Sequence, residues 1–302
     1  MYKVLEMNKI KEELYTLTTD KVEKDTTITV LTDIHYSNHF KEYKLNLILN
    51  YVFKTKPDYI CIPGDFIDTP EVLNNIDNQN ILKNWLKKLA NIAPVFLVLG
   101  NHDITIESKS FFDFVAKYHY DADFYNSLNE IENVCFLNNK QKEFDNIMFN
   151  GYSLPFNYYF KGNKCFEDVN TLITNYKSTN LNINGSNYNI LLCHSPEYII
   201  DDKVYKNINS FKYYDLIICG HMHSGIIRFG NNHGLINPQK RFFQNNCSGI
   251  IKKENTNLLV ARQVTTFSGI APKIFQLFNV FFPIYVSKII IKRNNQQIID
   301  KQ

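Results

Sequence analysis

The sequence has no hydrophobic run long enough to cross a membrane. Among its 302 residues, no uninterrupted apolar stretch reaches the roughly 18 residues that a membrane-spanning helix requires. Residues 1–25 mix lysine with glutamate and contain no apolar segment of the kind that forms the core of a signal peptide. We therefore expect a cytoplasmic protein.

Paired cysteines and a strong net charge are also absent. The six cysteines are scattered, and none has the CxxC spacing of a metal finger or a redox motif, so a reducing compartment is the simpler interpretation. The 33 basic residues nearly balance the 30 acidic residues, which leaves a net charge of +3. Dedicated nucleic-acid-binding proteins usually carry a stronger positive field. Nucleic acid is therefore not expected as the main partner.

A hydrophobic content of 44% is sufficient for a substantial core, and its pattern is typical of an α/β protein. Short β-branched runs alternate with amphipathic stretches of helical length, without a repeat or a Gly/Ser linker between them. Strands are predicted over residues 27–32, 59–62, 95–99, 147–152, 189–193, 215–219 and 285–292. Helices are predicted over residues 43–54, 81–91, 110–118, 167–176 and 197–208.

Polar motifs follow the predicted strands in chain order. They are Asp33-Ile34-His35, Gly64-Asp65-Phe66-Ile67-Asp68, Gly100-Asn101-His102-Asp103, His194, and Gly220-His221-Met222-His223. Residues at the carboxyl ends of strands converge on one crevice in an open α/β sheet. A single DxH is more often a capping aspartate beside a surface histidine, but five motifs in register after strands predict a metal site.

The residue types of these motifs favour a pair of divalent ions. Carboxylate and amide oxygens together with imidazole nitrogens suit Mn, with Fe, Zn or Co as alternatives. The seven candidate ligands are too many for one tetrahedral ion, whereas two ions sharing a bridging carboxylate would use them all. An extended backbone at Asp33-Ile34-His35 would point both ligands to one side and Ile34 into the core. The motif glycines are expected where the backbone turns sharply or approaches a metal.

The five motifs together resemble the calcineurin-like metallophosphoesterase superfamily, whose pattern is DxH, GDxxD, GNH[DE], H and GHxH in that order. The resemblance covers residues 33–223 and continues more weakly to about residue 292. It implies an α/β four-layer αββα sandwich of two mixed β-sheets flanked by helices, the calcineurin-like phosphoesterase fold. Residues 1–302 are expected to form a single metallophosphoesterase domain, with 264–302 as a C-terminal apolar segment and last strand, because ligands from 33 to 223 must meet at one centre.

The resemblance also implies a role for each motif residue. One ion would be held by Asp33, His35, Asp65 and His223. The other ion would be held by Asp65, Asn101, His194 and His221, so that Asp65 bridges the two. A metal-bridging hydroxide would attack phosphorus, with His102 as general acid and Asp103 orienting it. Asp68 would support a ligand without binding metal.

The expected activity is hydrolysis of a phosphomonoester, a phosphodiester or a pyrophosphate. A nuclease or cyclic-nucleotide phosphodiesterase fits the same metal pair, and a non-catalytic scaffold could share the fold; both stay open as alternatives. Thr69 stands where serine/threonine protein phosphatases have an arginine, which counts against that branch. Residues 191–197 and 214–221 look like a bacterial subgroup of stand-alone phosphoesterases that includes UDP-diacylglucosamine hydrolases.

The substrate is expected to be a small-molecule or lipid-like phosphoester. His39 lies four residues beyond His35, and Arg228 is one of four arginines that all follow residue 220, so both are candidate substrate contacts. Residues 274–282 belong to the most aromatic stretch of the chain, for which a buried helix or loop before the last strand is the plainer interpretation. The alternative is an apolar surface that meets a lipid-like substrate or makes peripheral contact with the inner membrane face.

Overall fold

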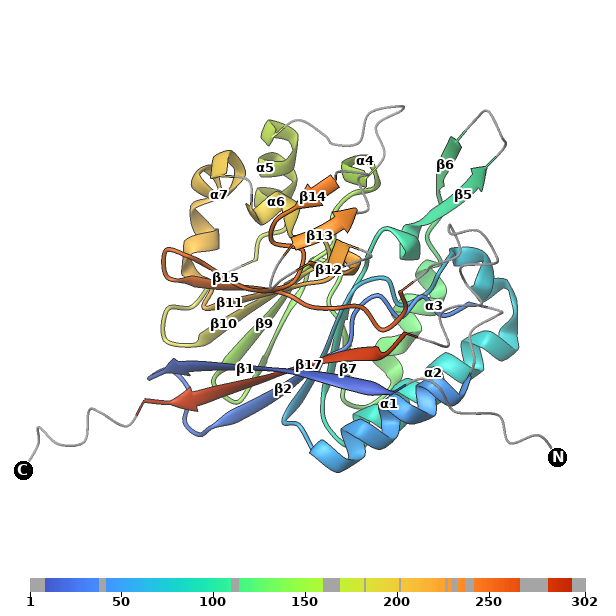
Figure 1. Ribbon diagram of the computed structural model, residues 1–302, viewed down its shortest axis with the longest axis horizontal. Coiled ribbons are helices and arrows are strands. Elements are labelled where there is room, and N and C mark those ends of the chain that lie inside the picture. The colour runs from blue at the N-terminus through green and yellow to red at the C-terminus, as the bar shows by residue number, and fades with distance from the viewer. Residues whose placement is uncertain are drawn as a thin grey trace, which may run out of the picture.

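Two six-stranded sheets pack face to face at the centre of the protein (Figure 1). The computed structural model describes residues 9–37, 42–109, 114–159, 169–181, 183–200, 202–225, 228–229, 233–236, 242–266 and 282–294. In spatial order, the first sheet consists of β1 (Ile10–Thr19), β17 (Ile284–Arg293), β2 (Thr26–Val30), β3 (Tyr59–Pro63), β4 (Val95–Val98) and β7 (Val134–Phe136). The second consists of β15 (Gly249–Lys253), β16 (Thr256–Val260), β11 (Leu216–Cys219), β10 (Tyr188–Cys193), β9 (Ile147–Tyr152) and β8 (Gln141–Phe144).

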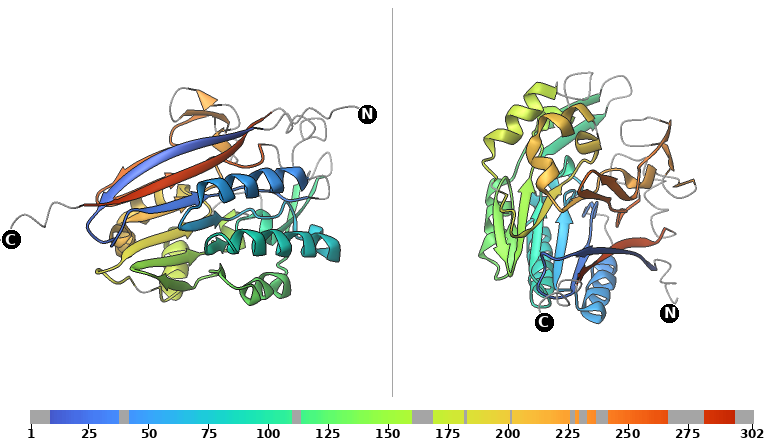
Figure 2. Two further views of the ribbon diagram at one scale, coloured as in Figure 1. Left: turned by 90° about the horizontal axis from the view of Figure 1, so that it is seen from below. Right: turned by 90° about the vertical axis from the view of Figure 1, so that its left-hand side faces the viewer.

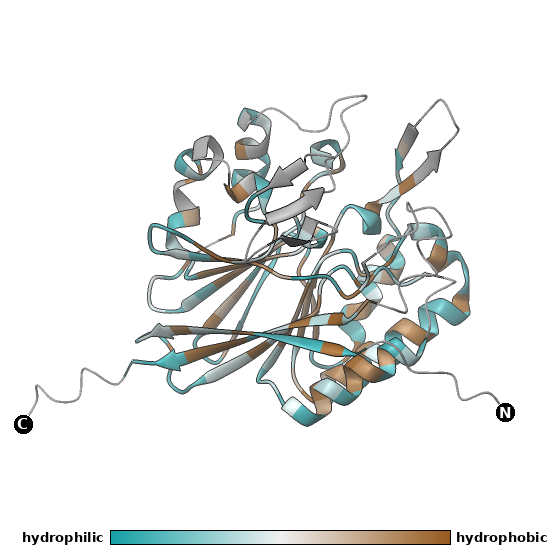
Figure 3. Ribbon diagram, viewed as in Figure 1, coloured by the Kyte–Doolittle hydropathy of each residue, from teal (hydrophilic) through white to brown (hydrophobic). Residues whose placement is uncertain are grey.

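Helices lie outside the two sheets, which gives the predicted αββα arrangement (Figures 1 and 2). On the first sheet they are α1 (Glu42–Thr55), α2 (Ile76–Ala90) and α3 (Ala122–Ser127). Beside the second sheet are α5 (Val169–Ser178), α6 (Glu197–Ile200) and α7 (Asp202–Asn207). Apolar and polar residues alternate in stripes along α1 and α2, as expected for helices that bury one face (Figure 3).

Successive side chains along a strand point to opposite faces of its sheet and so contribute to two separate apolar layers. In β3, Tyr59 and Cys61 point between the sheets, whereas Ile60 and Ile62 point toward the helices. Every residue of β3 is buried, because both faces of the strand are covered. Between the sheets, the rings of Phe96 and Phe149 stack with centroids 3.8 Å apart. These layers hold the strand ends, and hence the motif loops, in fixed positions.

Strand direction brings the motif loops to one edge. Strands β2, β3, β4 and β7 are parallel to one another, as are β9, β10, β11 and β16. The remaining strands are short or peripheral: β5 (Thr105–Lys109) pairs with β6 (Phe114–Tyr118), and β12 (Arg228–Phe229), β13 (His233–Ile236) and β14 (Phe242–Gln244) form a small sheet. The carboxyl ends of the parallel strands therefore carry the site.

The fold class and all seven predicted strands are confirmed, but one of the predicted helices is wrong. The helix expected over residues 110–118 is replaced by strand β6 over Phe114–Tyr118, which pairs antiparallel with β5. Its aromatic and β-branched residues suit a strand once a neighbouring strand supplies hydrogen bonds. The helix expected over 197–208 is divided into α6 and α7. The helices expected over 43–54, 81–91 and 167–176 are confirmed as α1, α2 and α5.

The terminal strands were only partly expected. Strand β17 corresponds to the predicted last strand, but β1 was not predicted, and the two pair in parallel from Ile10 with Ile284 to Thr19 with Arg293. Figures 1 and 2 show them side by side along the edge of the first sheet.

Within the described ranges, every helix is too short or too polar to span a bilayer. Residues 274–281 lie outside those ranges, so the membrane-contact hypothesis stays a prediction, as does the single domain over 1–302.

Candidate metal centre

Five loops at the carboxyl ends of strands bring the predicted ligands together. Strands β2, β3 and β4 of the first sheet and β10 and β11 of the second each lead into one of these loops. The side chains that the loops supply are Asp33, His35, Asp65, Asn101, His102, Asp103, His194, His221 and His223. All are buried except His223, whose side chain is 12% exposed. Residues separated by almost 200 positions in the chain thus share one buried site.

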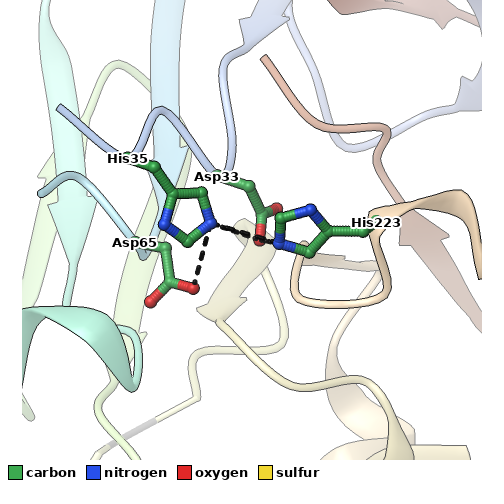
Figure 4. A group of neighbouring side chains, drawn as sticks. All are labelled: Asp33, His35, Asp65 and His223. Carbon is green, nitrogen blue, oxygen red and sulfur yellow. Dashed lines mark hydrogen bonds and ion pairs between the residues drawn. The ribbon is translucent and has the colours of Figure 1, made fainter. Parts of the chain in front are cut away.

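The first cluster contains Asp33, His35, Asp65 and His223 (Figure 4). The Nε2 atoms of His35 and His223 lie 3.1 Å apart, and His223 Nε2 lies 3.2 Å from Asp33 Oδ1. Asp65 Oδ2 lies 3.7 Å from His35 Nε2. One ligand atom from each residue falls within 4.8 Å of the others, so all four can reach a single ion.

The second cluster shares Asp65 with the first. Asp65 Oδ2 lies 3.0 Å from His194 Nε2, which in turn lies 3.2 Å from His221 Nδ1. These three residues also offer ligand atoms within 4.8 Å of one another. Asp65 is therefore the carboxylate between two potential ion sites.

The donor set of both clusters fits divalent ions. The side-chain oxygen of Asn101 is buried and has no hydrogen-bond partner among the described residues. A buried carbonyl oxygen in that state is costly, and coordination would satisfy it. Two buried carboxylates, Asp33 and Asp65, likewise need positive charge nearby, which divalent ions supply. The residues present thus suit a pair of metal ions.

The backbone at the ligands is left-handed, and this differs from the extended geometry expected at Asp33-Ile34-His35. Asp33 has φ 52° and His35 has φ 49°, and Asp65, His221 and His223 also have positive φ. Non-glycine residues adopt this conformation uncommonly, and it costs of order 1–3 kcal/mol each. Ile34 is nevertheless buried in the core, as predicted. Left-handed backbone at both ligands, rather than a continuous extended strand, thus accompanies their placement in one cluster.

The motif glycines are needed because side chains of the site occupy the space of a Cβ atom. At Gly64, which has φ 93°, a Cβ atom would lie 2.6 Å from His194 Nδ1. At Gly100 it would overlap the carboxylate of Asp65 and lie 2.5 Å from its backbone nitrogen. The positive φ of Gly64 agrees with the expected sharp turn, whereas the expected approach to a metal stays a prediction.

Replacing Gly100 with alanine is expected to destabilise the protein and weaken metal binding. The added methyl group must displace Asp65, and overpacking of this kind costs about 1–3 kcal/mol. The matched control is Gly185→Ala, because no atom lies within 4 Å of the corresponding Cβ position. Denaturant unfolding and metal titration of both variants check the prediction. Equal stability and metal affinity of the two variants would contradict it.

The two histidines of the second cluster have pKa values shifted in opposite directions. Burial opposes protonation of His194, but the adjacent Asp65 carboxylate outweighs it and raises the pKa of His194 to about 9. Burial and the neighbouring His194 lower the pKa of His221 to about 3. Burial also opposes ionisation of Asp65, but the nearby histidines hold its pKa well below the usual range. A metal ion at this position would therefore take the place of the proton on His194.

The structure gives Asp68 the contact that was expected of Asp103. The ring Nδ1 of His102 lies 2.8 Å from the carbonyl oxygen of Asp68, and the Asp68 carboxylate lies 3.4 Å from His35 Nδ1. Asp68 thus lies beside both histidines, and the three residues could themselves hold an ion, so the supporting role expected of Asp68 stays a prediction.

The role of Asp103 in orienting His102 stays a prediction, while its described hydrogen bonds lead to other groups. The Asp103 carboxylate accepts hydrogen bonds from the backbone N–H groups of Gly100, Phe66 and Ile67. It also accepts a hydrogen bond of 2.6 Å from the hydroxyl of Tyr125. Burial and the charge of Asp65 raise the pKa of Asp103 to about 6. Asp103 therefore links the loop after β3 to the loop after β4.

Two tyrosines near the site were missed from the sequence. Tyr125 belongs to α3, and Tyr159, at the end of α4 (Phe156–Tyr159), has its ring centroid 5.6 Å from that of His221. Neither belongs to a motif, and no local pattern distinguishes them from core tyrosines. Of the two candidate substrate contacts, His39 lies outside the described residues, and Arg228 is placed by its backbone in β12. Both contacts stay predictions.

Comparison with known proteins agrees with the motif pattern. A family model described as calcineurin-like phosphoesterase matches residues 26–225. A protein of Aquifex aeolicus named as an uncharacterized metallophosphoesterase is 24% identical over 230 residues, covering 76% of this chain and 75% of the relative. The protein YpbG of Bacillus subtilis is 24% identical over 231 residues, covering 76% of this chain and 73% of the relative.

Solved structures also align with the chain. A dimetal phosphatase from Danio rerio aligns with a TM-score of 0.42 at 11% identity, covering 80% of this chain and 88% of that chain. The names of the two sequence relatives specify no substrate, so the UDP-diacylglucosamine hydrolase subgroup stays a prediction.

Proposed function

Because the chain belongs to the calcineurin-like phosphoesterase family and is a metal-dependent phosphoester hydrolase, we propose that it hydrolyses a phosphomonoester, phosphodiester or pyrophosphate at a centre of two divalent ions. The observation that carries the proposal is the position of Asp65, whose carboxylate belongs to two adjacent clusters of potential ligands. A bridging carboxylate of this kind is the feature that a pair of ions requires.

Each ion would have its own set of ligands. One would be held by Asp33, His35, Asp65 and His223, and the other by Asp65, Asn101, His194 and His221. Oxygen and imidazole donors suit Mn, Fe, Zn or Co. When bound, such ions supply Lewis acidity, which activates water and offsets the negative charge of a phosphoryl group.

The outer nitrogen of three histidines faces an acceptor, which orients the ring. His194 Nδ1 donates to the carbonyl oxygen of Pro63 at 2.8 Å, so its Nε2 faces the centre. His223 Nδ1 lies 3.3 Å from the Thr266 carbonyl, and His35 Nδ1 lies 3.4 Å from the Asp68 carboxylate, although this contact is not a hydrogen bond. Such partners fix the tautomer and raise the basicity of the ligand.

His102 is suited to donate a proton to the leaving group. Its Nδ1 must donate to the Asp68 carbonyl, because a carbonyl oxygen only accepts, and this leaves Nε2 to exchange a proton. Its ring packs edge-on against His35, with centroids 4.5 Å apart. The proposed general acid thus sits beside the first ion site and is held by the same aspartate as the ligand His35.

Turnover of a chromogenic phosphodiester is expected in the presence of Mn²⁺ and should be lost when the metal is removed. Chelation should also lower the melting temperature, because saturation at 100 times Kd stabilises a protein by about 2.7 kcal/mol. Calorimetry and product absorbance measure the two effects, and added Mn²⁺ should restore both. If the protein binds metal but hydrolyses no monoester, diester or pyrophosphate with Mn, Fe, Zn or Co, the scaffold alternative would hold instead. A parallel panel of single-stranded DNA and cyclic nucleotides tests the nuclease alternative.

A further inference from the structure

The chain after β16 passes from the second sheet to the first and lies against the metal-binding loops. We call residues 261–266 the crossing segment. Its Val264 N–H donates to the Thr32 carbonyl at 2.9 Å, and its Thr265 N–H donates to the Asp33 carbonyl at 3.0 Å. The crossing segment therefore holds the loop of the first ion site directly.

Arg262 of the crossing segment makes contacts in three directions. Its Nη1 forms an ion pair with Glu13 of β1 at 3.1 Å, and its guanidinium carbon lies 3.3 Å from the ring centroid of Tyr285 in β17. Its Nε donates a hydrogen bond of 2.8 Å to the hydroxyl of Ser224. Arg262 is 7% exposed, so its side chain is largely shielded from bulk water. The terminal strands and the loop after β11 thus meet at one side chain.

Ser224 directly follows the proposed ligand His223 in a strained turn. His223 has φ 45° and Ser224 has φ 54°, so two successive residues are left-handed. Such a turn persists only where its surroundings restrain it. The Ser224 hydroxyl, which is 1% exposed, accepts from Arg262 and donates to Gln263 Oε1 at 2.9 Å. Both restraints come from the crossing segment.

We propose that Arg262 is a positioning residue for the ion held by Asp33, His35, Asp65 and His223. Its bond to Ser224 maintains the left-handed turn that aims His223 Nε2 at Asp33, while Glu13 and Tyr285 hold the guanidinium in place. The inference rests on the proposed two-ion function. An arginine is suited to this role because its planar group donates from several nitrogens and stacks on a ring at the same time.

The test compares metal binding by Arg262→Lys with that of the wild-type chain. Lysine keeps the positive charge opposite Glu13 and above Tyr285, so the variant should fold, but it lacks the Nε donor to Ser224. Calorimetric titration of the metal-free protein with Mn²⁺ should show two binding events in the wild type. Loss of one event in His223→Ala and of the other in His221→Ala assigns them.

We expect R262K to weaken the event assigned by His223 about 10- to 100-fold and to leave the other event unchanged. The electron paramagnetic resonance of bound Mn²⁺ should change at the same site. The matched control is Arg293→Lys, because Arg293 lies at the other end of β17 and donates to the Glu23 carbonyl at an exposed position. R293K should bind both ions as the wild type does.

A double variant separates this role from general destabilisation. Ser224→Gly removes the hydroxyl and tolerates the left-handed backbone. If Arg262 acts through Ser224, R262K should have no additional effect on metal affinity in the S224G background. Unchanged metal binding by R262K, equal weakening of both events, or additive effects in the double variant would overturn the inference and leave the proposed function standing. A wild-type chain that binds no Mn²⁺ would overturn both.

Discussion

Replacement of Asp65 by asparagine is expected to abolish binding of the ion pair and to reduce turnover by about 10³-fold or more. The Asp65 carboxylate lies 3.0 Å from His194 and 3.7 Å from His35, so it serves both clusters. Its second oxygen accepts a hydrogen bond of 2.9 Å from the backbone N–H of His102. Asparagine keeps the shape but removes the negative charge and one acceptor oxygen. Metal titration and steady-state kinetics measure the two losses.

The matched control for Asp65→Asn is Asp58→Asn. Asp65 follows β3, whereas Asp58 precedes it, at the opposite end of the strand. The Asp58 carboxylate accepts hydrogen bonds from the backbone N–H and the hydroxyl of Thr27. The D58N variant tests the loss of a structural carboxylate away from the site, and it should retain metal and turnover. Full activity in D65N, or an equal loss in D58N, would refute the bridging role.

Replacement of His102 by glutamine is expected to preserve metal binding and to slow the reaction in a manner that depends on the leaving group. Asp65 accepts its hydrogen bond from the backbone of His102, which the substitution retains. Loss of a general acid costs about 10²- to 10⁴-fold. The loss should be largest for an alkyl ester, whose basic alkoxide needs a proton, and small for a nitrophenyl ester, whose leaving group is stable as an anion.

The control for His102→Gln is His119→Gln, an exposed histidine after β6. H119Q should leave the rates for both esters unchanged. Equal losses for the alkyl and nitrophenyl esters in H102Q would show that His102 positions substrate or metal and does not deliver the proton. Retention of both ions in H102Q, measured by titration, is needed for either interpretation.

Local pattern was sufficient to predict the central strands and the motif residues. Strand β3 and the loop that follows it illustrate why. A short apolar run leads into Gly64 and Asp65, and both the run and the motif can be recognised within about ten residues of sequence. Strand β1 was not visible in this way, because three consecutive charged residues interrupt its apolar pattern near the start and the strand is defined by its pairing with β17 at the other end of the chain. Strand β6 was mistaken for a helix for the same reason, since its partner β5 decides its conformation.

The candidate ligands, their order and the fold class could be predicted from the sequence alone, because residue type indicates metal chemistry and the parallel strands carry the motifs to a common edge. Only the tertiary structure decided how the ligands are aimed. The left-handed backbone at Asp33 and His223, the bond from Tyr125 to Asp103 and the contacts of Arg262 all depend on residues brought together by packing. No local sequence signal encodes such contacts, since the energy that holds a strained turn comes from neighbours distant in the chain.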